Sequence, residues 1–338
     1  MSLVTTARVL AKKAILSSKA LRLGNKHCSR SIVILKYHSV QERPEEFDAS
    51  IGLSIVHPLG EFRKQMEVIA RDYNPVTIDD ILLFLRGEKE LPKCAVAITF
   101  DDGYLDNFEI AAPVLDRFGI RATFYVTVGT IEPALPPWFV RLRHAIWTTK
   151  KKEVAYLGNG SVLKIHDRND RLAAMRVSSK MCANLVRDSQ EKAIKHIEDS
   201  LDVEPFIPRN SLMMNWDQIR KLHESGHLIG SHTIDHPNVA HLRQEDLNWE
   251  LTESKRVLDK ELLAPVIHFS YPNPALTPQF NEQTTAAARK SGYETAVISS
   301  NGPVCNGDDP MLLERLSTPI QKEEFLWNLE CTLLGRRV

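Results

Sequence analysis

Two adjacent carboxylates, Asp101 and Asp102, are the first residues in the chain whose chemistry stands out. They come directly after the apolar run Ala95–Phe100, which predicts a buried strand, and before Gly103, which lets the chain turn sharply. Adjacent carboxylates repel each other and raise a pKa unless a cation or donor lies nearby. These residues alone are equally well explained by a catalytic or cation-binding site and by a turn with an aspartate cap.

A pair of histidines lies at the end of a second predicted strand, His227–Ser231. His232 and His236 are four residues apart, a spacing that places two imidazoles on one side of a helical turn. An isolated histidine is more often structural, but this pair follows a strand in the same way as Asp101 and Asp102. One carboxylate and two imidazoles, with positions left for water, form a plausible catalytic site for a divalent ion.

The elements that must position these residues alternate between strands and helices. Repeated strand–helix units predict a parallel sheet covered by helices, either open or closed into a barrel, with ligands bound at the carboxyl ends of the strands. The predicted strands are Ile32–Tyr37, Ala95–Phe100, Ala122–Val128, His227–Ser231, Val266–Ser270 and Glu294–Ile298. The predicted helices are Leu59–Asp72, Asn107–Phe118, Asp217–Ser225, Gln244–Leu262 and Asn281–Ser291.

Residues 131–214 interrupt this alternation. Gly158-Asn159-Gly160 between two short apolar runs predicts a hairpin, and two polar helices are expected over 170–186 and 190–200. We interpret the stretch as an inserted α+β segment that serves as a lid or a docking surface.

Composition excludes several classes of protein. Lys and Arg number 43 and Asp and Glu number 43, so the net charge of zero argues against a nucleic-acid partner bound through a basic surface. The chain contains no uninterrupted apolar run of about 18 residues, so no membrane-spanning helix is predicted. The five scattered cysteines form no C-x-x-C pair, which favours free thiols in a reducing, cytoplasmic environment over disulfides.

The N-terminal segment, residues 1–30, is basic and amphipathic. Residues 1–41 contain no acidic residue, and residues 3–22 place apolar and basic side chains on opposite faces of a helix. A secretory signal is excluded because there is no apolar core of 7–15 residues. Three interpretations stay open: packing on the protein's own body, peripheral contact with an anionic membrane, and a mitochondrial transit peptide.

Three motifs occur in order at predicted strand ends: TFDDG at 99–103, SHTIDHP at 231–237 and FSYPNP at 269–274. This arrangement resembles the polysaccharide deacetylase family, also described as the NodB-homology domain and as carbohydrate esterase family four. The segments YHSV at 37–40 and ATFYVTVG at 122–129 fit as well. The resemblance covers residues 31–320, followed by a C-terminal helix at 321–338. It implies a distorted (β/α) barrel of about seven strands.

The resemblance also implies a set of site residues. Matched by motif, Asp102, His232 and His236 hold one divalent ion, with zinc expected first and nickel, cobalt or manganese also suitable. Asp101 matches the general base, which takes a proton from the attacking water. The products would be acetate and a free amino sugar.

The third motif departs from the common Arg-Pro-Pro-Tyr-Gly form of the family. Ser270 stands at the arginine position, and Asn273 and Pro274 replace tyrosine and glycine. The Phe-x-Tyr-Pro form here resembles a branch that acts on bacterial exopolysaccharides. Tyr271 and Asn273 are expected to contact substrate, and a backbone N–H near them is expected to bind the oxyanion.

The late Leu-x-His motif, which supplies the general acid in the family, is not visible. We expect His38, at the end of the first strand, to take this role, with a structural histidine bonded to a loop carbonyl as the alternative. Arg315 is expected at the substrate site and as a replacement for the missing arginine that orients the base, with an ordinary salt bridge as the alternative.

The predicted function is the metal-dependent hydrolysis of an N-acetyl group on a sugar or a lipid-linked glycan intermediate. The alternatives are a deformylase or O-deacetylase on a related glycan, and an inactive glycan-binding barrel. A glycosidase is disfavoured because adjacent strand residues point to opposite sides, whereas its two acids must face each other across one bond. The expected location is cytoplasmic, and peripheral membrane contact through residues 3–22 is one of the three open interpretations.

Overall fold

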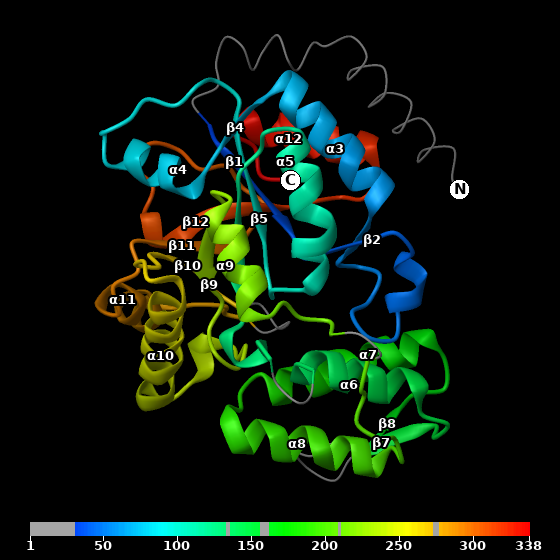
Figure 1. Cartoon of the computed structure of the whole chain (residues 1–338). Coiled ribbons are helices and arrows are strands. Elements are labelled where there is room, and N and C mark those ends of the chain that lie inside the picture. Colours follow the sequence, from blue (N-terminus) through cyan, green and yellow to red (C-terminus); the bar gives the residue numbers. More distant parts are fainter. Residues whose placement is uncertain (1–30, 133–135, 156–161, 209–210, 273–276) are drawn as a thin grey trace.

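The computed structural model describes residues 31–132, 136–155, 162–208, 211–272 and 277–338. Seven parallel strands form a closed barrel, because β1 pairs with β12 on one side and with β5 on the other (Figure 1). A short strand, β4 (Asn74–Val76), adds to the outer edge of β5. The predicted (β/α) barrel is therefore confirmed. Around the barrel the strands are β1 (Val33–Tyr37), β12 (Leu313–Ser317), β11 (Thr295–Ser299), β10 (His268–Ser270), β9 (Leu228–Ser231), β6 (Ala122–Val126) and β5 (Ala95–Phe100).

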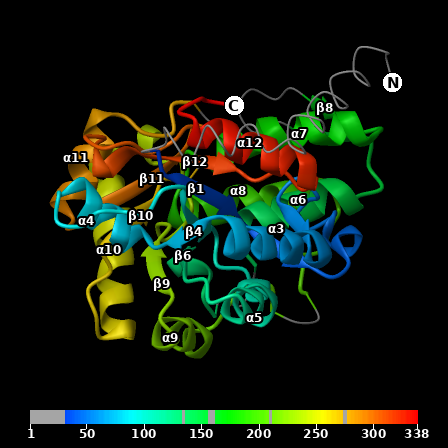
Figure 2. The ribbon, with the colours of Figure 1, turned by 90° about the horizontal axis from the view of Figure 1, so that it is seen from above.

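Helices surround the barrel, as the view down onto it shows (Figure 2). They are α3 (Leu59–Asp72), α4 (Ile78–Leu85), α5 (Ala112–Arg117), α9 (Trp216–Glu224), α10 (Gln244–Leu262), α11 (Glu282–Lys290) and α12 (Lys322–Leu333). A short parallel pair, β2 (Ser39–Gln41) and β3 (Val56–Pro58), follows β1.

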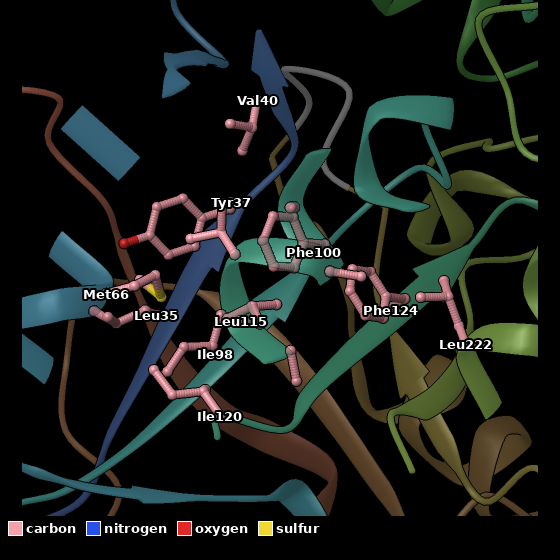
Figure 3. Close-up of a cluster of buried hydrophobic side chains, with 14 of the residues drawn as sticks. Leu35, Tyr37, Val40, Met66, Ile98, Phe100, Leu115, Ile120, Phe124 and Leu222 are labelled. Carbon is pink, nitrogen blue, oxygen red and sulfur yellow. The ribbon is translucent and has the colours of Figure 1, made fainter. Parts of the chain in front are cut away.

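Side chains alternate between two apolar layers along each strand. Leu35 and Phe100 face outward and pack against helix residues such as Met66 and Leu115 (Figure 3). Ile34 and Ala97, which pair in register, face the barrel interior with Tyr125, Val297 and Leu313. Because both faces of these strands are buried, they appear in the sequence as continuous apolar runs rather than as alternating ones.

The segment that interrupts the alternation packs into a layer of its own beside the barrel (Figure 1). Its elements are α6 (Trp138–Thr148), the antiparallel pair β7 (Glu153–Ala155) and β8 (Val162–Lys164), α7 (Arg168–Cys182) and α8 (Arg187–Ser200). The antiparallel pairing predicted for the hairpin and the two polar helices are confirmed, whereas the turn at 158–160 lies outside the described residues. The helix α6 was not predicted. Leu142, Ile146, Ile165 and Ile194 form a separate apolar cluster within this segment.

No helix within the described ranges is both long enough and apolar enough to cross a bilayer. The basic amphipathic segment at residues 1–30 lies outside the described residues, so its predicted membrane contact stays a prediction.

Candidate active site

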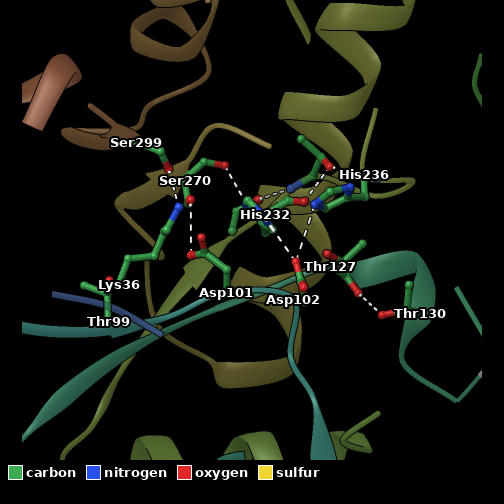
Figure 4. Close-up of polar contacts among 12 residues, drawn as sticks. Lys36, Thr99, Asp101, Asp102, Thr127, Thr130, His232, His236, Ser270 and Ser299 are labelled. Carbon is green, nitrogen blue, oxygen red and sulfur yellow. Dashed lines mark hydrogen bonds and ion pairs between the residues drawn. The ribbon is translucent and has the colours of Figure 1, made fainter. Parts of the chain in front are cut away.

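Side chains from several strand ends converge at the carboxyl end of the barrel. Asp101 and Asp102 follow β5, and His232 follows β9 (Figure 4). His236 comes from the loop after β9, and all four side chains are buried. This is the ligand-binding end of a parallel barrel, as expected from the sequence.

Asp102, His232 and His236 lie close enough to share one ion. Asp102 Oδ1 is 3.6 Å from His232 Nε2 and 3.4 Å from His236 Nε2, and the ligand atoms all lie within 4.8 Å of one another. Two atoms that each bind zinc at about 2.1 Å in tetrahedral geometry would be about 3.4 Å apart. The three side chains therefore fit a divalent ion.

The protonation of His232 also suits a metal ligand. Its Nδ1–H donates to the Ser270 carbonyl oxygen at 2.7 Å, which leaves the Nε2 lone pair directed at Asp102. Burial lowers the pKa of His232 to about 4, so the ring is neutral at neutral pH. A hydrogen bond on the far nitrogen is how proteins fix the orientation of a metal-binding imidazole.

The ligand loops hold an uncommon backbone conformation. Asp102, Thr233 and His236 have φ values of 76°, 69° and 55°. Such left-handed residues cost on the order of 1–3 kcal/mol each when they are not glycine, so the surrounding contacts must hold them in place. Two of these contacts are His236 N–H to Thr233 Oγ1 at 3.1 Å and Thr127 N–H to the Asp102 carbonyl oxygen at 3.3 Å.

Glu250 holds the loop between the two histidines. It lies fully buried on α10, and its Oε2 accepts hydrogen bonds from the backbone N–H of Ile234 at 2.8 Å and of Asp235 at 3.1 Å. No motif singled out Glu250. The available signal was its position, because it lies one residue before Leu251 and three after Leu247, within the apolar stripe of its helix.

Replacing Glu250 by Ala is expected to weaken metal binding about 10–100-fold, because removing a group that supports metal ligands has effects of this size. Titration with a chromophoric chelator measures the affinity directly. Glu250→Gln keeps an acceptor oxygen and should retain most of it. Glu253→Ala is the matched control, because Glu253 forms only a surface pair with Arg256 on the same helix. Equal affinities for the Ala variant and the wild type would contradict the role.

Asp101 is bound by a buried arginine. Arg315 on β12 donates from its two terminal nitrogens to the two carboxylate oxygens of Asp101 at 2.6 and 2.7 Å. It also donates to Ser270 Oγ at 3.0 Å. Burial alone would raise the pKa of Asp101. The charge and hydrogen bonds of Arg315 outweigh this effect and hold the pKa well below its usual range. Asp101 is therefore an ionised acceptor at neutral pH.

The placement of Arg315 bears on its two expected roles. The side chain has no exposed surface, so it is not available for the direct substrate contact expected from the sequence. Its bidentate contact with Asp101 is the geometry of a residue that orients the base. Ser270, at the usual arginine position, joins the same contact by donating to Asp101 Oδ1 at 3.3 Å.

Tyr271 does not match its expected role as a substrate contact. The side chain is buried against Phe269 and Phe280, and its backbone N–H donates to the Val297 carbonyl oxygen at 3.2 Å. The Tyr271 amide is therefore already bonded and is not an oxyanion donor. Asn273 lies outside the described residues.

His38 lies half-buried directly after β1. Asn107 Nδ2 donates to its backbone carbonyl oxygen at 2.6 Å, which fixes the chain at this point. Burial lowers the pKa of the imidazole, and the nearby charges of Asp102 and Asp101 act in the opposite direction. Among the described residues, no loop carbonyl accepts a hydrogen bond from its ring.

The inserted segment forms part of the wall of the site. The Phe139 ring at the start of α6 lies 4.9 Å from the His236 ring, centroid to centroid. The Trp138 indole N–H donates to the Asp235 carbonyl oxygen at 3.0 Å. These aromatic residues were not predicted at the site, because nothing in the sequence relates residues 138–139 to a loop almost 100 positions later.

Solved structures of several deacetylases share this fold. The Streptococcus pyogenes deacetylase PplD, solved in complex with acetate, aligns with a TM-score of 0.59 at 18% identity, over 90% of this chain and 99% of its own. IcaB from Ammonifex degensii aligns with a TM-score of 0.58 at 18% identity, over 89% of this chain and 97% of its own. At this level of identity the likeness shows the fold.

Sequence comparison identifies the family. Bacillus subtilis (strain 168) YxkH, whose name places it with the polysaccharide deacetylases, is 24% identical over 284 residues, or 84% of this chain and 70% of its own length. Residues 88–296, more than half of the chain, match the family model named polysaccharide deacetylase. The protein therefore belongs to the polysaccharide deacetylase family.

Proposed function

We propose that the protein is a metal-dependent hydrolase that removes the N-acetyl group of a sugar or glycan intermediate. The observation that carries the proposal is the juxtaposition of the Asp102–His232–His236 cluster with an ionised, arginine-bound Asp101. Family membership supports deacetylation of a glycan more broadly.

The proposed chemistry assigns one task to each buried group. A divalent ion held by Asp102, His232 and His236 would polarise the acetyl carbonyl and make a water more acidic. Asp101 takes the proton of the attacking water, and Arg315 keeps the carboxylate oriented for it. The charge and hydrogen bonds of Arg315 hold the pKa of Asp101 below its usual range, so the carboxylate is ionised and able to accept a proton. His38 donates a proton to the nitrogen that leaves.

The test is acetate release from the zinc-supplied protein across a panel of N-acetylated, O-acetylated and N-formylated sugars. Release from N-acetylated sugars alone supports the proposal. A preference for O-acetyl or formyl groups would favour the alternative hydrolases, which use the same residues. Binding of glycans with no acyl release from any of them would favour a binding barrel.

Replacing His38 by Ala is expected to lower turnover about 10²–10⁴-fold, the usual contribution of a positioned proton donor or acceptor. The loss should shrink for a substrate whose leaving group needs no proton, such as an acetate ester of a nitrophenol. Full turnover of the N-acetyl substrate by the variant would remove His38 from the mechanism.

Residues 3–22 are proposed to hold the protein on an anionic membrane, close to a lipid-linked substrate. Their acid-free, amphipathic composition supports this proposal. Deleting residues 1–24 is expected to lower recovery with anionic vesicles in a flotation assay while leaving turnover of a soluble sugar intact. Equal recovery of the two proteins would contradict the anchor.

A further inference from the structure

Lys36 is a charged residue on the inward, otherwise apolar face of β1. It lies two residues after Ile34, so its stem enters the barrel interior at the level of Thr99 on β5. The ammonium reaches past β12 and donates to Ser299 Oγ on β11 at 2.9 Å (Figure 4). Ser299 is the last residue of β11, so the ammonium lies at the carboxyl end of the barrel beside the proposed active site, and Lys36 is partly exposed there.

Lys36 has no ion-pair partner among the described residues. Arg315, the other cation of the barrel mouth, is paired with Asp101, whereas no carboxylate of the described residues lies within ion-pair distance of Lys36. The residues outside the described ranges contain no Asp or Glu at all. An ammonium has three N–H donors, and Ser299 takes one of them.

The local charges leave room for an anionic group beside Lys36. Asp101 is paired with Arg315, and Asp102 lies against His232 and His236 and beyond ion-pair distance of Lys36. Burial and the charge of Arg315 lower the pKa of Lys36 to about 8, against the opposing effect of the two carboxylates, and the group is still mainly protonated at neutral pH. A partly desolvated charge without a counter-ion is costly, and such groups are typical of binding sites.

We propose that Lys36 and Ser299 form an anion-binding subsite that takes a carboxylate or phosphate oxygen of the ligand. The inference rests on the proposed deacetylation and narrows its substrate to an acetylated sugar or glycan that carries an acidic group near the acetamide. The same oxyanion chemistry could also be supplied by the acetate that the reaction releases, and the experiment separates these two sources.

The experiment compares N-acetylglucosamine with N-acetylglucosamine 1-phosphate and N-acetylmuramic acid, using the wild type, Lys36→Met and Lys36→Arg. Lys36→Met should raise KM for the acidic sugars on the order of tenfold more than for the neutral one, as expected when a charged hydrogen bond is lost. Lys36→Arg, which keeps the charge, should restore most of the difference. Lys64→Met is the matched control, because Lys64 is exposed on α3 and pairs with Glu61.

The second arm measures inhibition by acetate. An inhibition constant that rises in Lys36→Met, with equal KM changes for acidic and neutral sugars, assigns the subsite to the released acetate. Equal KM changes together with an unchanged acetate constant overturn the proposal.

Direct binding keeps the subsite testable even if no sugar is hydrolysed. Calorimetry on the metal-free protein measures the affinity for N-acetylglucosamine 1-phosphate without any contribution from a bound ion. Weaker binding by Lys36→Met than by the wild type and the Lys64→Met control supports the subsite independently of turnover. Equal binding by all three proteins, or no binding by any of them, overturns it.

Discussion

An Asp101→Asn variant is expected to keep its metal and lose at least about 10²-fold in kcat. Asparagine has nearly the shape of aspartate but cannot accept a proton at neutral pH. The change also leaves the Arg315 guanidinium, fully buried and bound to both Asp101 oxygens at 2.6 and 2.7 Å, without its counter-ion. Breaking such a buried pair costs about 3–5 kcal/mol, so unfolding must be measured beside turnover.

Metal content separates the loss of a base from the loss of the site. Elemental mass spectrometry should find the same metal per chain in Asp101→Asn as in the wild type, because Asp102 and the two histidines are unchanged. Asp217→Asn is a suitable control, since Asp217 lies exposed on α9 and forms a surface ion pair with Arg220. A variant that keeps its metal, stays folded and turns over within threefold of the wild type would remove Asp101 from the role of base.

The parts of the fold that the sequence predicts are those set by local patterns. Both faces of the central strands are buried, so these strands appear in the sequence as continuous apolar runs such as AVAITF. The helices between them carry an apolar stripe. The candidate metal ligands were indicated by their position shortly after two strands, and the family motifs then matched Asp102, His232 and His236 to a ligand set. A strand that ends at the ligand-binding face places the next residues in the site.

The alternation of side chains explains the error at Tyr271. His268 and Ser270 on β10 make their contacts inside the barrel, with Thr295 and with Asp101, so Phe269 and Tyr271 must face the surrounding helices. Applying this period-two alternation across the third motif would have placed Tyr271 in the outer layer. The family motif alone does not carry that information.

The residues that no pattern indicated act across large sequence distances. Glu250 supports a loop 15 residues away, whereas Trp138 and Lys36 reach partners 97 and 263 positions along the chain. Such contacts depend on which elements become neighbours in the barrel. In the case of Lys36, a single lysine in an apolar strand does not say which side of the strand it faces. For the same reason, the sequence left Arg315 open between a residue that orients Asp101 and an ordinary salt bridge.

A His232→Ala variant is expected to lose the bound metal and, with it, measurable turnover. The substitution removes one of three ligands together with the ring that the Ser270 carbonyl holds in place at 2.7 Å. The wild type should carry about one transition-metal ion per chain. His241→Ala is the matched control, because His241 is exposed shortly after the same loop.

Thermal unfolding provides a readout of metal binding that does not depend on any substrate. An ion that binds only the folded protein stabilises it by about 4 kcal/mol when its free concentration is 1,000 times the dissociation constant. Added zinc should therefore raise the melting temperature of the wild type and of His241→Ala, and leave that of His232→Ala nearly unchanged. The comparison requires that the His232→Ala variant still folds. We expect it to fold, because burial keeps the His232 ring neutral and its removal leaves no charge without a partner. An absence of metal and of any zinc-dependent stabilisation in the wild type would refute metal-dependent hydrolysis and leave a barrel that binds glycans without cleaving them.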